Sequence, residues 1–202
     1  MKLIRDLINE NFEDIPSDKG YYTWWFTKDK TEFLLSKINR ELNAVDRIDF
    51  SKLKKHPDIN YYALYFGIAC GTAGLKQRIK WHTAKINGHT KNNVVRGTLS
   101  TLRQTICGLN EWDMVVSSDN VDDFLSDCYW EWVVFPDSQI IKNIEQNKLK
   151  NDEICQIIKN IESSELKNKN KCYPLNIQGN ETISKECRKL LKRLRKKYRN
   201  NG

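Results

Sequence analysis

Residues 65–82 read Tyr65-Phe-Gly-Ile-Ala-Cys-Gly-Thr-Ala-Gly-Leu-Lys-Gln-Arg78-Ile-Lys-Trp-His82. The aromatic start predicts a strand, and the part after the glycine-containing turn predicts a helix. Because Arg78 and His82 are four residues apart, we expect them to share one helix face. A tyrosine, a permanently charged guanidinium and an imidazole at one point suit an enzyme that binds a phosphodiester and moves a proton beside it.

The composition predicts a folded protein with a real core, since 39% of its 202 residues are hydrophobic and six are Trp. No apolar stretch approaches the roughly 20 residues that span a bilayer, and the N-terminus lacks the apolar core of a signal peptide. The six cysteines are scattered without CxxC or zinc-site spacing, which favours reduced thiols. We therefore expect a cytoplasmic protein with no membrane partner.

The positive charge is concentrated near the C-terminus. Residues 185–199 hold nine Lys or Arg and one Glu, a difference equal to the net charge of +8 for the whole chain. Such a segment binds polyanions through counterion release. Taken alone, it would more often be a solvated helical face.

Hydrophobic spacing and turn residues predict the order of the elements. Helices are expected at 2–12, 30–43, 94–109 and from 152 onward, with further helices containing Arg78 and following Asp137. Strands are expected at 21–26, 60–69, 112–116 and 128–135. No internal repeat or low-complexity linker interrupts residues 1–180. The pattern predicts one mixed α/β domain followed by a basic helix.

Four motifs occur in an order that resembles the GIY-YIG nuclease superfamily. The first is Gly20-Tyr21-Tyr22, the second begins at Tyr65-Phe-Gly, the third is Glu162-Ser-Ser-Glu-Leu-Lys, and the fourth is Pro174-Leu-Asn176-Ile. They span residues 20–177. The resemblance implies an α/β (α+β) fold, a small three-stranded antiparallel sheet flanked by helices, with helical insertions. We expect a nuclease domain at 1–180, with an insertion at about 27–58, and a basic helical tail at 181–202.

The resemblance also implies an active site. The implied catalytic residues are Tyr22, Tyr65, Arg78, His82, Glu162 and Asn176. The two tyrosines would position the attacking water, one of them as general base, while Arg78 would hold phosphate oxygens. His82 would orient a tyrosine or relay a proton, and Asn176 would brace the site. Tyr21 and Tyr62 are the alternatives if the strand register differs, because a one-residue slip reverses the face.

Glu162 is the expected metal ligand, and its competitor is Glu165 on the same predicted helix. The family has apolar residues three and four positions after its glutamate. The residues at those positions after Glu162 match this pattern in part, and those after Glu165 match it less well. One carboxylate is sufficient for Mg²⁺ or Mn²⁺, because such ions keep several waters and also bind substrate phosphate.

The predicted function is a divalent-metal-dependent endonuclease that hydrolyses phosphodiester bonds in DNA, most simply double-stranded, and is of restriction type. The expected nucleic-acid contacts are Lys76, Lys80, His89, Arg188, Lys192 and Arg195. Alternatives are a DNA repair or mobile-element nuclease, RNA as substrate, a catalytically inactive nucleic-acid-binding module, and a structural protein with an incidental match. The oligomeric state stays open, with a dimer as one option.

Overall fold

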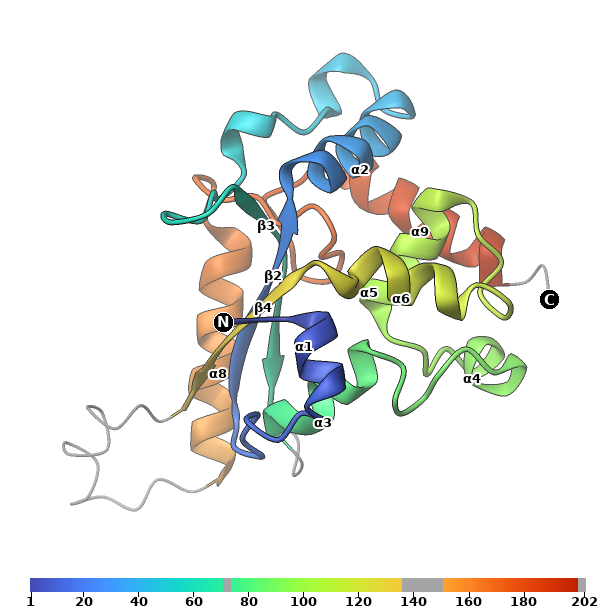
Figure 1. Cartoon of the computed structure of the whole chain (residues 1–202). Helices are drawn as coiled ribbons and strands as arrows, with labels where there is room; N and C mark the ends of the chain where they lie inside the picture. The colour runs from blue at the N-terminus through green and yellow to red at the C-terminus, as the bar shows by residue number, and fades with distance from the viewer. Residues whose placement is uncertain (71–73, 136–150, 200–202) are drawn as a thin grey trace.

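The fold is a four-stranded antiparallel sheet with helices on both faces (Figure 1). The computed structural model describes residues 1–70, 74–135 and 151–199. The strands lie in the order β1-β4-β2-β3, so β3 is an edge strand with a single strand neighbour. This arrangement confirms the α+β class, although the sheet has four strands and not the three that the family resemblance implied.

The strands and helices alternate irregularly along the chain. The strands are β1 (Lys2–Leu3), β2 (Gly20–Thr27), β3 (Tyr61–Ala69) and β4 (Tyr129–Val134). The helices are α1 (Ile4–Asn9), α2 (Lys28–Arg40), α3 (Gly74–His82), α4 (Lys91–Arg96), α5 (Thr101–Asn110), α6 (Ser118–Ser126), α8 (Asn151–Lys167) and α9 (Lys185–Arg199), with short 3₁₀ turns η1 (Ala44–Asp46) and η2 (Phe50–Lys52).

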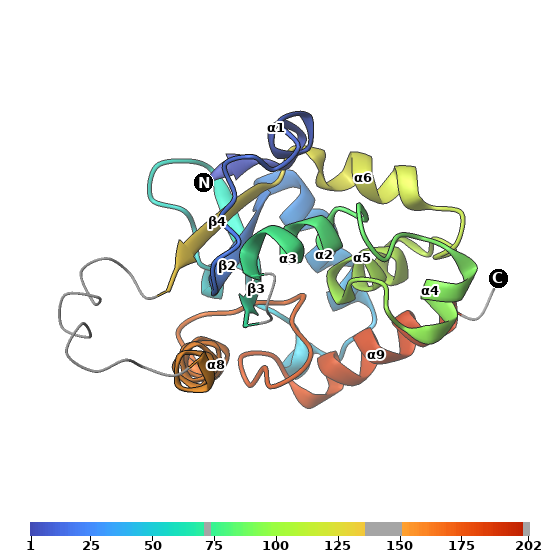
Figure 2. The same ribbon diagram turned by 90° about the horizontal axis from the view of Figure 1, so that it is seen from below.

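The two faces of the sheet carry different cores, because successive strand side chains point to opposite sides. Tyr21 and Trp25 lie on the face that α8 covers, in a small cluster with Phe66. Tyr22 and Trp24 face the larger core, to which α1, α2, α3, α5 and α9 contribute. Figure 2 shows α8 end-on, with the segment that connects it to α9 lying between the two helices.

The fourth strand arises at the N-terminus, where the sequence predicted a helix over 2–12. Lys2 and Leu3 pair with Trp130 and Tyr129 of β4, so the chain is extended there before α1 begins. The helix ends early because Asn11 and its neighbour take left-handed backbone angles.

Two further predictions over residues 94–116 are wrong. The helix expected at 94–109 is divided into α4 and α5, because Gly97 has a φ of +70° and ends α4 with a left-handed cap. The strand expected at 112–116 is a turn, in which Asp113 accepts hydrogen bonds from the backbone of Val115 and Val116. Helix α6 was not expected, and the helix predicted after Asp137 falls outside the described residues.

The basic helix α9 packs against the domain. Its N-terminus is capped by Ser184, whose Oγ accepts from Cys187 N at 3.0 Å. Cys187, Leu190 and Leu191 are buried in the same core as the sheet, and the helix lies against α5. The charges of α9 are therefore held in a fixed position relative to the sheet. Within the described residues, every helix is too short or too polar to cross a membrane.

Replacing Leu191 by Ala should lower the free energy of unfolding by about 2–5 kcal/mol, because its side chain is fully buried between α9 and the core. Urea denaturation followed by tryptophan fluorescence measures the change. Lys196→Ala, at an exposed position of the same helix, is the control and should alter stability by no more than about 0.5 kcal/mol. Equal stability of the two variants would mean that α9 is only a loose attachment.

Candidate active site

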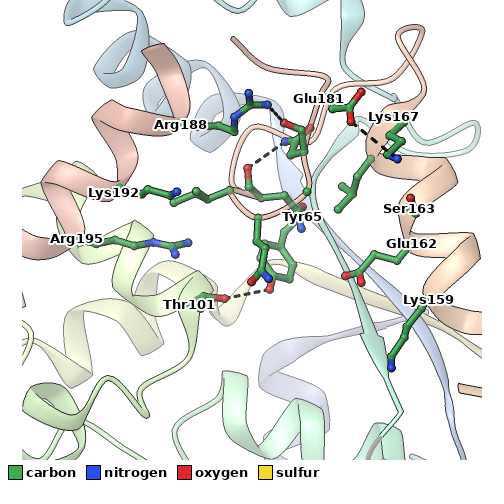
Figure 3. Close-up of a pocket in the computed structure, with 16 residues that line it drawn as sticks. Tyr65, Thr101, Lys159, Glu162, Ser163, Lys167, Glu181, Arg188, Lys192 and Arg195 are labelled. Carbon is green, nitrogen blue, oxygen red and sulfur yellow. Dashed lines mark hydrogen bonds and ion pairs between the residues drawn. The ribbon is translucent and has the colours of Figure 1, made fainter. Parts of the chain in front are cut away.

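A cleft of about 1130 Å³ lies beyond the edge of β3 (Figure 3). Helix α8 contributes Lys159 and Glu162 to one wall, and α9 contributes Lys192 and Arg195 to the opposite wall. Tyr65 of β3 lies between the two walls, beside Thr101 at the start of α5. Four elements that are separate in the sequence therefore form one site.

The register of β2 and β3 brings the two predicted tyrosines together. The rings of Tyr22 and Tyr65 are stacked with centroids 6.4 Å apart. Gly67 lies directly across from Tyr22, and a Cβ at that position would be only 2.4 Å from the Tyr22 hydroxyl oxygen. The glycine is thus required for the tyrosine to lie flat over the neighbouring strand. Tyr21 packs against Phe66 on the other face.

His82 forms a hydrogen bond at each ring nitrogen. Its Nε2 is 2.7 Å from the Tyr22 hydroxyl, and its Nδ1 is 2.7 Å from Ser100 Oγ. All three side chains are buried. The sequence predicted the link between histidine and tyrosine but not Ser100, which immediately precedes α5 and reaches His82 only through tertiary packing.

The electrostatics of this group keep both the tyrosine and the histidine neutral. Burial raises the pKa of Tyr22 well above 10, and the Tyr65 hydroxyl adds to the effect, while the charge of Arg78 opposes it. Burial and the nearby Arg78 and Arg103 hold the pKa of His82 well below its usual value of about 6.5. At neutral pH the imidazole is therefore an uncharged proton acceptor beside a protonated phenol.

Arg78 lies at the side of this group. Its guanidinium stacks on Trp81, 4.7 Å from the ring centroid, and it borders a smaller hollow that shares no lining residue with the main cleft. Its charge acts on Tyr22, His82 and Glu162, so it is near all three. No described carboxylate forms an ion pair with it.

Glu162 points into the cleft from α8, and burial raises the pKa of its carboxyl group, with Arg78 acting in the opposite direction. Among the described residues, no hydrogen-bond donor or ion-pair partner reaches it. Glu165 lies elsewhere: it accepts a hydrogen bond from the Tyr173 hydroxyl at 2.8 Å and pairs with Lys171 at 2.7 Å. Of the two glutamates, Glu162 is the one whose oxygens are available to a metal or a substrate.

Asn176 closes the open edge of β3. Its side-chain amide pairs with both backbone groups of Phe66, accepting from N at 2.8 Å and donating to O at 2.7 Å. The next residue back, Leu175, donates its N–H to Leu64 O at 3.0 Å. The segment therefore satisfies edge groups that lack a strand partner, and it fixes the strand that carries Tyr65.

The six predicted nucleic-acid contacts fall into two groups. Arg188, Lys192 and Arg195 line the cleft, although Arg188 also donates to the backbone oxygen of Asn180 and so holds the adjoining loop. The other three, which do not line the cleft, are Lys76, Lys80 and His89. Lys159, which was not predicted, lines the cleft one turn before Glu162, and that helical spacing is the signal that would have identified it.

His89 has both ring nitrogens occupied. Nδ1 donates to the carbonyl oxygen of Met114 at 2.6 Å, and Nε2 accepts from Arg103 Nε at 2.7 Å. Arg103 is fully buried and also pairs with Asp122 at 2.6 Å. Within the described residues, His89 therefore belongs to a hydrogen-bonded network that supports the fold.

Strands β2 and β3 and helices α3 and α8 together supply two stacked tyrosines, an arginine, a neutral histidine and a carboxylate with no partner among the described residues, which are the groups that a phosphodiester-cleaving site requires. Residues 20–197 match the protein family described as GIY-YIG catalytic domain. The chain therefore belongs to the GIY-YIG nuclease superfamily, which implies a nucleic-acid substrate. Neither the curated proteins nor the solved structures include a match to this chain.

The tautomer of His82 provides a direct test of the hydrogen-bonded group. We expect the ring proton on Nδ1, from where it is donated to Ser100 Oγ, while Nε2 accepts the proton of the Tyr22 hydroxyl. The reason is that a phenol is a stronger hydrogen-bond donor than a neutral imidazole N–H. Nitrogen chemical shifts of the imidazole distinguish the tautomers. Ser100→Ala should shift the population toward Nε2–H, and Ser100→Thr, which keeps the hydroxyl, should not; an Nε2–H tautomer in the unaltered protein would contradict the assignment.

His89 should make folding sensitive to acid. Burial is the main cause that lowers its pKa to about 4, so between about pH 6.5 and 4 the unfolded chain takes up a proton that the folded chain does not. Stability is therefore lost as the pH falls through this window. His89→Gln keeps an acceptor for Arg103 and cannot titrate, so its thermal midpoint should fall less steeply from pH 7 to 4; parallel curves for both proteins would refute the role of His89.

Proposed function

We propose that the protein is a divalent-metal-dependent endonuclease that hydrolyses phosphodiester bonds in double-stranded DNA. The observation that carries the proposal is the Glu162 carboxylate, which has no hydrogen-bond or ion-pair partner among the described residues. It faces Lys192 and Arg195 across the cleft, with Tyr65 between the two walls. A carboxylate on one side and cations on the other suit a metal ion and a polyanionic strand that are bound together.

The donor set at Glu162 fits Mg²⁺ or Mn²⁺. Both ions accept one carboxylate together with waters and phosphate oxygens, whereas a structural zinc site requires several His, Cys or carboxylate ligands. The described residues contain no cluster of three or more such ligands. When bound, the metal would oppose the charge on the phosphoryl oxygens and on the leaving oxygen.

The protein's own groups form a path for the proton of the attacking water. Tyr65 borders the cleft, its ring stacks on that of Tyr22 with centroids 6.4 Å apart, and the Tyr22 hydroxyl is hydrogen-bonded to the neutral His82. A water at Tyr65 can attack phosphorus while its proton moves along the two hydroxyls to Nε2 of His82. The high pKa of Tyr22 is compatible with this role, because the phenol passes a proton on and does not need to ionise beforehand.

Arg78 and the cations of α9 would hold the DNA backbone. A guanidinium forms paired hydrogen bonds with phosphate, and the half-exposed Arg78 has its face on Trp81 and its nitrogens free of carboxylates within the described ranges. The helical insertion between β2 and β3 supports a restriction-type enzyme as the particular class, with repair and mobile-element nucleases as the alternatives.

The test is cleavage of supercoiled plasmid by the unaltered protein and by Glu162→Gln, with Mg²⁺, Mn²⁺ or EDTA. We expect metal-dependent nicking or linearisation that falls about 10³-fold or more in the variant, while DNA binding in EDTA is retained. Glu165→Gln, three residues along the same helix, is the control and should still cut. Undiminished cleavage by Glu162→Gln would refute the site, and binding without cleavage in every metal would show a catalytically inactive module.

A further inference from the structure

Among the basic residues of α9 that line the cleft, Arg195 differs from Lys192 in its burial and in how firmly its side chain is held. Its side chain is half-buried, and Figure 3 shows it pointing into the cleft from the wall opposite Glu162. Lys192, one turn earlier on the same face, also lines the cleft but is exposed. The two residues thus share a location and differ in how firmly they are held.

Two hydrogen bonds fix the guanidinium of Arg195. Both its Nε and its Nη2 donate to Thr105 Oγ1, the former at 2.7 Å. Thr105 in turn donates its hydroxyl to the backbone oxygen of Thr101, whose own Oγ1 is 3.2 Å from the Tyr65 hydroxyl. Thr101 and Thr105, one turn apart on α5, therefore position Tyr65 and Arg195 respectively. The Nη1 edge of the Arg195 guanidinium is left for another partner.

The guanidinium has no counter-ion in the parts of the chain that the structure describes, since no carboxylate lies within ion-pair distance. Arg103, by contrast, is fully buried and pairs with Asp122. Burial lowers the pKa of Arg195 to about 10, with a further contribution from Arg199, so it stays charged at neutral pH. A buried charge without a partner is costly, and an anion that enters the cleft would remove this cost.

We propose that Arg195 is a second arginine of the active site, which binds a non-bridging oxygen of the scissile phosphate from the side opposite Arg78. This inference rests on the proposed nuclease function. It differs from general attraction to DNA, because a fixed donor that is aimed at the developing charge acts on the rate of the chemical step, whereas an exposed lysine acts on affinity. Lys192 is then a contact to the backbone only.

The experiment compares Arg195→Lys with Lys192→Ala in single-turnover cleavage at saturating DNA, together with DNA affinity in EDTA. Arg195→Lys should lower the saturating rate by about 10²-fold or more and change Kd by less than about threefold, since one positioned donor is lost and the charge is kept. Lys192→Ala should weaken binding and leave the saturating rate within about threefold. A saturating rate for Arg195→Lys close to that of the unaltered protein would overturn the inference.

Thr105→Val provides a second test that leaves the arginine in place. It removes the oxygen that holds the guanidinium and keeps the shape of the side chain, so the saturating rate should fall by about 10-fold with little change in thermal midpoint. An unchanged rate would mean that Arg195 needs no fixed position. If the unaltered protein cleaves and depends on Glu162 while both variants remain fully active, only this inference fails; absence of cleavage by the unaltered protein refutes the proposed function and this inference with it.

Discussion

The pairing of β2 with β3 is the constraint on which the rest of the site depends. Its register sets Tyr22 across from Gly67 and brings Tyr65 to the same face, so both phenols point toward the helices that carry the polar groups. A slip of one residue would place Tyr21 there instead, in the position now taken by its neighbour. The glycine is part of the same constraint, since any larger residue would collide with the Tyr22 ring. Local sequence and strand pairing thus act together.

The cleft lies beyond the edge of β3 that has no strand neighbour. An edge strand normally presents unpaired backbone groups, and here Asn176 and Leu175 satisfy them at Phe66 and Leu64. This closure keeps β3 from pairing with another chain at that point and leaves the Tyr65 side chain facing the cleft. The connection from α8 to α9 runs through this edge segment, so the carboxylate wall and the cationic wall are attached to the strand between them.

Local patterns were sufficient to predict the central strands and the long helices, because each has regular spacing. The family resemblance pointed to Tyr22, His82 and Glu162; the structure places Tyr22 beside His82 and Glu162 in the cleft, and their catalytic roles stay predictions. Local patterns were insufficient for β1, which has two residues and forms only through its pairing with β4. Ser100 and Thr105 were missed for a related reason: small hydroxyl residues are common, and their roles come from how α5 packs against α3 and α9. The packing of α9 against α5 also brings α9 to the wall of the cleft. The charge of the segment alone did not predict that position.

The arginines separate into two electrostatic classes. Arg103, which supports the fold, is paired with Asp122, while Arg78 and Arg195 have no carboxylate partner among the described residues. Burial and the charges of Arg78 and of the paired Arg103 hold His82 neutral, and a neutral imidazole can accept a proton where a charged one cannot. A phosphate bound at Arg78 would offset the charge of that residue and thereby raise the basicity of His82. The histidine would then become a better proton acceptor at the moment when a substrate is bound.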